Sequence, residues 1–432
     1  MKRVLIITYQ FPPNPSVASV RPAGLAKYLP EFGWQPVVLT ARMPGRSAAG
    51  LTLIETPYKD LFGSWKRLLG IDPDQNIMTQ VNQLKRKLHI KSERSLLDRM
   101  VAIVGEIVAY PDPQKGWKSP AIEAGSDFLG REPVDAIISS SSPYTVHIIA
   151  RTLKLRHRIP WVADFRDLWT QNHYYPYSRL RRRMERGLEL RTLSSADTLV
   201  TVSGPLTQRL EELHKGKPAH TITNGFDPSE VNSPTASLTE KFTITYTGNL
   251  YPGKQSPEPL FAALKQLIDE GAIDSSSVEV RFYGPEAGWI ESQASHYGIE
   301  GLVKQFGIIR RHEALDRQRE SQLLLLLKWN DPSEKGTYSG KVFEYLAARR
   351  PIVAVGGYQD VVSELLDETG AGREGSTAED VKSVLQGFLD EYRANGKLSY
   401  RGDQNKADRY SQRGMAQKYA QVLDGLAGPG AE

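Results

Sequence analysis

The chain has 432 residues, 40% of them hydrophobic, and no cysteine. This length favours two or three domains, and the lack of cysteine excludes disulfides, thiolate catalysis and cysteine-ligated zinc. A net charge of +5 favours anionic partners such as phosphates or lipid headgroups. The N-terminal aliphatic run is too short for a signal peptide and the run at 323–327 too short for a membrane span, so we expect a cytoplasmic protein.

The first residues predict a βαβ unit. Apolar strands are expected at 4–8 and 36–40, with Leu25, Leu29 and Phe32 at helical spacing between them. No G-x-G-x-x-G follows the first strand, which disfavours an ordinary dinucleotide-binding domain. The stretch from about 45 to 110 is harder to interpret. Asp72-Pro73-Asp74 is more typical of a turn than of a metal site, and the basic segment 84–97 is partly helical. YPDPQKGW at 110–117 is a proline-rich loop.

From residue 134 the alternation of strands and helices resumes. Strands are expected at 136–139, 161–163, 198–202 and 221–223. The strands at 136–139, 161–163 and 221–223 lead into polar loops at their carboxyl ends, where α/β sheets place functional residues. The candidates for catalysis are Asp164, Arg166 and Asp167 in ADFRDLW, and those for the acceptor side are Ser142 in SSSSP and Asn224 in NGFD. An alternative for the second loop is an internal Asp–Arg ion pair that braces it.

A basic helix is predicted at residues 178–191. Leu180, Met184 and Leu188 recur every four residues among its arginines, which is typical of an amphipathic helix that lies on an anionic membrane. The alternative is a solvated helix with intrahelical ion pairs. No recognition motif for nucleic acid accompanies the charge. The arginines are Arg179, Arg181, Arg182, Arg183, Arg186 and Arg191.

The second half repeats the architecture after a linker at 228–238. Strands are expected at 242–247, 278–284, 303–307, 323–329 and 351–355, and a last helix at 411–426. We therefore predict an α/β fold of two Rossmann-like, doubly wound domains with a cleft between them. The predicted bounds are 1–228, 229–408 and, for a helix that crosses back to the first domain, 409–432.

The strand at 242–247 opens into the turn G-x-x-x-x-G-K, which ends at Lys254. A strand, a glycine turn and a helix N-terminus, with a lysine added, suit a diphosphate. A P-loop kinase or ATPase is disfavoured because Gln255 stands where Ser or Thr would hold Mg²⁺. An ordinary glycine turn is the other alternative.

A second glycine-rich turn at 336–340 leads into a helix with Glu344 in its first turn. This carboxylate could compensate the helix dipole or hold a sugar diol. Gly284, which ends the strand at 278–284, lies at the same predicted edge.

The order and spacing of TGNLYPGK, NGFD, GKVFEYLAARRPIVA and the following glycine pair resemble glycosyltransferases of the GT-B fold, in particular retaining family 4. PDPQKGW and WVADFRDLW resemble a bacterial subgroup of surface-polysaccharide assembly. The resemblance implies that Lys254 and Gly248 meet the diphosphate of a nucleotide sugar and that Glu344 holds its ribose. It also implies that backbone amides of Ser339, Gly340 and Lys341 meet phosphate.

Three positions depart from the pattern of this family. Asn249 replaces the arginine that usually follows the first glycine, Gly336 replaces the first glutamate of E-x7-E, and Arg166 replaces a histidine. The resemblance implies transfer of a sugar from a nucleotide-diphosphate sugar to a saccharide or lipid-linked acceptor, with retention and without a metal or other cofactor.

An inverting reaction would instead need a general base, for which Asp164 or Asp167 is the candidate. Arg21 or Arg166 would meet an acceptor phosphate. Two further alternatives stay open: a nucleotide-sugar 2-epimerase of the same fold, and a degenerate, non-catalytic sugar-nucleotide-binding partner.

Overall fold

The computed structural model describes residues 1–14, 16–43, 50–60, 105–175, 177–231, 237–334 and 336–428. The predictions for Asp72-Pro73-Asp74, for the segment 84–97 and for the centre of the linker at 228–238 lie outside these residues. The chain divides into two compact units: unit 1 is Met1–Ile222 with Ala416–Glu432, and unit 2 is Thr223–Met415. The sequence had predicted these boundaries at 228 and 408.

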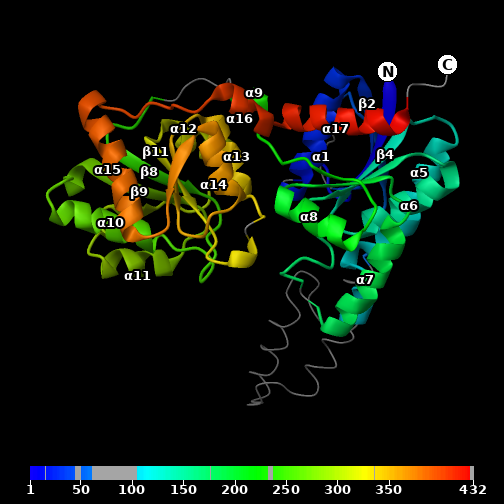
Figure 1. Cartoon of the computed structure of the whole chain (residues 1–432), viewed down its shortest axis with the longest axis horizontal. Helices are drawn as coiled ribbons and strands as arrows, with labels where there is room; N and C mark the ends of the chain where they lie inside the picture. Colours follow the sequence, from blue (N-terminus) through cyan, green and yellow to red (C-terminus); the bar gives the residue numbers. More distant parts are fainter. Residues whose placement is uncertain are drawn as a thin grey trace, which may run out of the picture. The chain divides into compact units, whose positions relative to one another are not determined.

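Unit 1 holds a parallel sheet of seven strands in the order β3-β2-β1-β4-β5-β6-β7, with helices on its faces (Figure 1). Its interior strand β1 ends in a continuous apolar run because both faces of a parallel sheet are covered. Its elements are β1 (Lys2–Ile7), α1 (Val17–Tyr28), β2 (Trp34–Ala41), β3 (Thr52–Thr56), α5 (Lys118–Leu129), β4 (Ala136–Ser141), α6 (Thr145–His157), β5 (Trp161–Phe165), α7 (Arg179–Leu193), β6 (Thr198–Thr201), α8 (Gly204–Leu213), β7 (Ala219–Thr221) and most of α17 (Gln412–Ala427).

Unit 2 holds a parallel sheet of six strands in the order β10-β9-β8-β11-β12-β13. All five leucines of β11 are buried, as a central strand of such a sheet requires. Its elements are α9 (Pro228–Val231), β8 (Phe242–Thr247), α10 (Glu258–Asp269), β9 (Val278–Tyr283), α11 (Gly288–His296), β10 (Val303–Gln305), α12 (Arg311–Glu320), β11 (Leu323–Leu327), α13 (Gly340–Ala348), β12 (Ile352–Val355), α14 (Val361–Thr369), β13 (Gly372–Gly375), α15 (Ala378–Asn395) and α16 (Gln404–Ala407).

Both sheets reverse their winding at one point. In unit 1 the chain moves outward from β1 in one direction and from β4 in the other, and in unit 2 the same reversal separates β8 from β11. Ligands of open α/β sheets bind beyond the carboxyl ends of the strands at such a switch point. The ends of β1 and β4, and those of β8 and β11, are therefore the places to search for sites.

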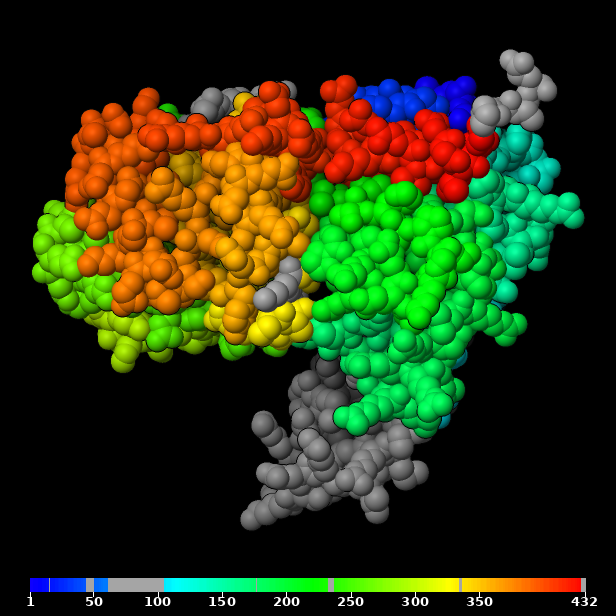
Figure 2. Space-filling view, in the orientation of Figure 1, coloured from blue at the N-terminus to red at the C-terminus, as the bar shows by residue number. Residues whose placement is uncertain are grey.

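Helix α17 returns to the unit that begins the chain. Figures 1 and 2 show it in red beside the blue N-terminal segment of unit 1. Asp424 accepts hydrogen bonds from Lys2 Nζ at 3.0 Å and from Trp34 Nε1 at 3.1 Å. The predicted helix that crosses back to the first domain matches this path.

The entry to unit 2 and its exit lie side by side. Phe226 forms an isolated parallel bridge with Ser411, and the Gln412 amide donates to the Phe226 carbonyl at 2.7 Å. A Cβ on Gly225 would lie 2.4 Å from the carbonyl carbon of Ser411, so glycine is required for this close approach.

Candidate functional site

The predicted phosphate turn in unit 2 begins at the carboxyl end of β8. The Gly248 amide donates to the Tyr283 carbonyl at 2.7 Å, and a Cβ on Gly284 would lie 2.2 Å from the Gly248 oxygen. Gly248 itself has a φ of 113°. The two predicted glycines are therefore in contact, and each is needed for the backbone geometry at the ends of β8 and β9.

Lys341 reaches this turn from the first turn of α13. A Cβ on Gly248 would lie 2.6 Å from Lys341 Cε and 3.2 Å from Nζ. The ammonium lies 5.2 Å from the centre of the Tyr246 ring, whose hydroxyl donates to the Asn249 carbonyl at 2.6 Å. The side chain of Lys341 thus reaches the site where the sequence had assigned only its backbone amide.

The N-terminus of α13 contributes backbone donors to the same edge. Ser339 is its N-cap residue but its side chain bonds no amide of the helix, and Gly340 is exposed. The side chain of Asn249 is exposed as well. Free amides at a helix N-terminus together with a lysine favour an anion.

Glu344 lies one turn further along α13 and is held by two side chains of α12. Arg311 Nη2 and Gln318 Nε2 each lie 3.5 Å from its carboxylate, and Gln318 also donates to Thr247 Oγ1 at 2.8 Å. Arg311 makes a closer ion pair with Glu230, at 2.7 Å. Sequence reasoning missed Arg311 and Gln318, because α12 carries no motif.

Lys254 lies on the far side of the glycine turn, beside the loop that follows β11. Its Nζ is 3.7 Å from Asp331 Oδ2 and 5.9 Å from the Trp329 ring centre. Its carbonyl accepts from the Asn330 amide at 2.9 Å. The next residue, Gln255, is buried and donates to the Leu327 carbonyl at 2.8 Å, so it fixes the turn to β11 and does not face a ligand.

These residues gather at the carboxyl ends of adjacent strands β9, β8 and β11, at the switch point of the sheet. The edge carries glycine backbone, two lysines and a helix N-terminus. Asp331 lies beside Lys254, and the carboxylate of Glu344 is set apart by one turn of α13. Such an arrangement can bind a diphosphate and a neighbouring diol.

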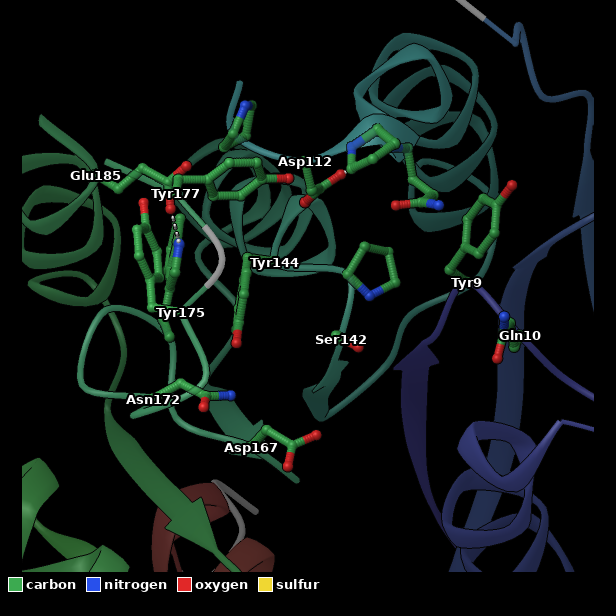
Figure 3. Close-up of a pocket in the computed structure, with 15 residues that line it drawn as sticks. Tyr9, Gln10, Asp112, Ser142, Tyr144, Asp167, Asn172, Tyr175, Tyr177 and Glu185 are labelled. Carbon is green, nitrogen blue, oxygen red and sulfur yellow. Dashed lines mark hydrogen bonds between the residues drawn. The ribbon is translucent and has the colours of Figure 1, made fainter. Parts of the chain in front are cut away.

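Unit 1 has a cavity of about 360 Å³ at its own switch point (Figure 3). Tyr9 and Gln10 follow β1, and Ser142 and Asp167 follow β4 and β5. The wall is aromatic and acidic, with no lysine or arginine among its lining residues. They are Tyr9, Gln10, Pro111, Asp112, Pro113, Gln114, Ser142, Pro143, Tyr144, Asp167, Trp169, Asn172, Tyr175, Tyr177 and Glu185.

Asp112 joins two elements at this cavity. It caps the 3₁₀ turn Pro113–Trp117 by accepting from the Gln114 amide at 3.0 Å, and it accepts from the Thr145 amide at 2.7 Å and hydroxyl at 2.8 Å. Burial raises the pKa of Asp112 to about 6, although these hydrogen bonds oppose the shift. Sequence reasoning had placed Asp112 only within a proline-rich loop. An aspartate directly before a proline is a helix N-cap signal that could have identified its role.

Asp164 does not fit the predicted role of a general base. Its side chain has no exposed surface and accepts from Arg21 Nε at 3.0 Å and from Ser140 Oγ at 2.6 Å. Burial alone would raise the pKa of Asp164, but the charge of Arg21 and these hydrogen bonds hold it below its usual value.

Arg21 is equally enclosed, so it does not face an acceptor phosphate as expected. Its Nη2 also donates to the Ile222 carbonyl at 2.8 Å and to Tyr419 Oη at 2.9 Å. The pair with Asp164 is the internal brace that was the alternative prediction.

Arg166, the other residue predicted to meet an acceptor phosphate, instead holds backbone. Its guanidinium donates to the carbonyls of Ser141 at 2.5 Å, Ser142 at 2.6 Å and Ala18. The side chains of Ser142 and Asp167 are exposed and line the cavity. Asp167 is therefore the predicted carboxylate that can reach a ligand in unit 1.

Asn224, predicted on the acceptor side, belongs by its contacts to unit 2, which begins at Thr223. It is half-buried in the NGFD turn.

Helix α7 buries charge and exposes apolar side chains, the reverse of an ordinary surface helix. Arg181 and Glu185 form an i,i+4 ion pair in which each is at most 4% exposed, whereas Leu180 is 71% and Met184 56% exposed. Glu185 also accepts from Trp169 Nε1 at 3.0 Å. The predicted intrahelical pair exists but is buried. Of the predicted apolar stripe, Leu180 and Met184 face outward, whereas Leu188 packs against the core of unit 1.

Comparison with known families gives one match. Residues 18–225 match the model described as "Glycosyl transferase 4-like domain". No curated protein matches the chain in sequence.

Solved structures match the chain over nearly its whole length. Anabaena Alr3699/HepE in complex with UDP and glucose is 14% identical with a TM-score of 0.58, covering 98% of this chain and 99% of that one. A glycosyltransferase from Rickettsia africae is 11% identical with a TM-score of 0.60, covering 99% of both. The lipopolysaccharide outer core galactosyltransferase WaaB is 10% identical with a TM-score of 0.54, covering 98% and 99%. At these identities the likeness establishes the GT-B fold.

Proposed function

We propose that this chain, which has the GT-B fold and whose residues 18–225 match a glycosyl transferase 4-like domain, is a glycosyltransferase. It would move a sugar from a nucleoside-diphosphate sugar held in unit 2 to a saccharide or lipid-linked acceptor held in unit 1. The observation that carries this proposal is the gathering of Gly248, Lys254, Lys341 and Glu344 at one sheet edge. UDP is the first diphosphate to test, because Alr3699/HepE was solved with it.

In this reaction the chain's residues stabilise the leaving group. Charge grows on the diphosphate as the sugar departs, and we propose that the two lysines and the α13 amides stabilise this charge without a metal. Glu344 would accept hydrogen bonds from the ribose hydroxyls. We propose retention of configuration, which the resemblance to family 4 supports, and the exposed carboxylate of Asp167 is the candidate base if the reaction inverts.

The acceptor is proposed to enter the aromatic cavity of unit 1. Its volume of about 360 Å³ suits a single sugar ring. Its tyrosines can stack on the ring, and its carboxylates can accept hydrogen bonds from the ring hydroxyls. The likeness to the lipopolysaccharide outer core galactosyltransferase WaaB supports a role in surface polysaccharide or glycoconjugate synthesis.

A thermal-shift panel of UDP, GDP, ADP and TDP tests the donor site. A ligand at one hundred times its Kd stabilises the folded state by about 2.7 kcal/mol, which corresponds to roughly 5–10 °C for a unit of this size. We expect one nucleotide to shift the wild type and the Lys265→Ala control, which changes an exposed lysine of α10, but to shift Lys254→Ala much less. No shift with any nucleotide in folded protein would overturn the donor-site proposal and favour a degenerate partner.

We also propose that α7 holds the protein at the cytoplasmic face of an anionic membrane. Among the described residues no helix is both long and apolar enough to cross a membrane, so binding would be peripheral. Exposed Leu180 and Met184, beside exposed Arg179, Arg183 and Arg186, can insert apolar groups between anionic headgroups.

Charge reversal tests this membrane proposal. Each arginine near an anionic surface contributes about 1 kcal/mol, so Arg179→Glu, Arg183→Glu and Arg186→Glu together should weaken binding to phosphatidylserine vesicles by about 100-fold or more. The matched control reverses three exposed arginines of unit 2, Arg393, Arg401 and Arg409, and should retain most binding. Equal co-sedimentation of both triple variants would refute the role of α7.

A further inference from the structure

We infer that the side chain of Lys341 is a catalytic cation of this enzyme. Its ammonium would bind the departing diphosphate at the glycine turn, where residue 249 is an uncharged asparagine. The inference rests on the proposed function and adds a residue to its chemistry. Three observations carry it: the position of the ammonium, its lack of a counter-ion among the described residues, and its difference from Lys254.

The first observation is the position of the ammonium. The Lys341 side chain crosses from α13 to the end of β8 and lies against Gly248, where a Cβ would come within 2.6 Å of its Cε. Lys341 can therefore occupy this space only because Gly248 has no side chain. Asn249, the next residue, is exposed and uncharged. The family resemblance implies a cationic side chain at residue 249. In this chain the cation at the same turn is Lys341, from α13.

The second observation is that Lys341 has no counter-ion among the described residues. Among the described residues, its ammonium has no hydrogen-bond acceptor and no carboxylate within ion-pair distance, and its contact is with the face of Tyr246. Burial lowers the pKa of Lys341, and the charge of Glu344 opposes this only in part. A half-buried ammonium without a counter-ion costs stability, so the position is unfavourable until an anion arrives.

The third observation separates the two lysines of the turn. Lys254 already lies 3.7 Å from Asp331 and over the ring of Trp329, and its side chain is 41% exposed. Lys341 is more enclosed and lies beside the α13 N-terminus, whose amides also favour an anion. A cation in a less solvated place acts more strongly on developing charge. We therefore assign to Lys341 the larger share of diphosphate stabilisation.

Calorimetric titration of Lys341→Met tests the assignment. The probes are UDP, GDP, ADP and TDP with their monophosphates, because only the diphosphates carry the second phosphate. A charge-assisted hydrogen bond contributes enough that its loss should weaken diphosphate binding about 10- to 100-fold. Binding of the monophosphate should change less than about threefold. Lys265→Met, on the solvent side of α10, is the control and should bind as wild type.

Stability without ligand supplies a second readout. Because methionine removes an unpaired charge from a half-buried position, Lys341→Met should melt at the wild-type temperature or above it when no nucleotide is present. Gly248→Ala, which keeps the lysine but fills its space, should show the same selective loss of diphosphate affinity. Lower stability of Lys341→Met, with equal losses for mono- and diphosphate, would make Lys341 a structural residue.

Two other outcomes are distinguishable. If wild type and Lys341→Met bind the same diphosphate equally, the assignment of Lys341 is overturned while the proposed function stands. If wild type binds no diphosphate, the proposed function fails and the assignment fails with it.

Discussion

Replacement of Arg21 by methionine is expected to lower the free energy of unfolding of unit 1 by about 3–5 kcal/mol. The guanidinium is 3% exposed, and its removal leaves the fully buried carboxylate of Asp164 without a counter-charge. It also removes donors from the Ile222 carbonyl and from Tyr419 Oη. Such an uncompensated buried charge is among the most destabilising single changes known in protein interiors.

Hydrogen exchange in urea measures this effect separately in each unit. Amides of β1 and β5 should exchange faster in Arg21→Met, whereas those of unit 2 should be unchanged. Arg191→Met, at an exposed position of α7, is the control. The double variant Arg21→Met with Asp164→Leu should recover part of the loss, since it removes both charges. A single variant as stable as the control would show that the pair does not brace unit 1.

Gly284→Ala, which adds one methyl group, is expected to lower diphosphate binding and sugar transfer at the donor site strongly. The new Cβ would lie 2.2 Å from the Gly248 oxygen, and the hydrogen bond from Gly248 to Tyr283 ties the two loops so that neither can withdraw freely. Overpacking of this kind costs about 1–3 kcal/mol. The displaced turn would also move Lys341 away from its place, and a shift of 1 Å at a reacting centre can lower activity about 100-fold.

Gly288→Ala provides a matched control four residues away. Gly288 begins α11, and a Cβ there would meet no atom within 4 Å. This alanine should leave diphosphate affinity unchanged and raise stability slightly, because alanine favours a helix. Wild-type Kd and transfer rate in Gly284→Ala would contradict the close packing of the two glycines.

The sequence predicted the two doubly wound sheets because apolar strands and helical spacing alternate regularly along most of the chain. It missed β13, whose residues GREG carry no apolar alternation. This edge strand depends instead on close backbone contact, since a Cβ on Gly372 would lie 2.3 Å from the Ile352 carbonyl oxygen. The only trace of such a contact in the sequence is the glycine itself. Because glycines also occur in turns, helix caps and bulges, this glycine does not predict a strand.

How far a site residue could be predicted depends on whether a motif fixes its backbone or a side chain decides its role. The glycines of the phosphate turn came from residue spacing, and the phosphate-facing amides of α13 came from the resemblance to family 4. The direction of Lys341 did not, because its partner turn is about ninety residues away in sequence. The burial of Asp164, and of Arg181 with Glu185, could not be read from periodicity, since charged residues are normally expected outside.

The return of α17 has a consequence for synthesis of the protein. Unit 2 is one uninterrupted segment whose ends pair at Phe226 and Ser411, so a nascent chain can complete it as soon as that segment leaves the ribosome. Unit 1 is synthesised first, but it is incomplete until Tyr419 and Asp424 have been made. Tyr419 accepts a hydrogen bond from Arg21 of the buried ion pair, and Asp424 accepts one from Trp34. The half of the enzyme that is made first is therefore the half that finishes folding last.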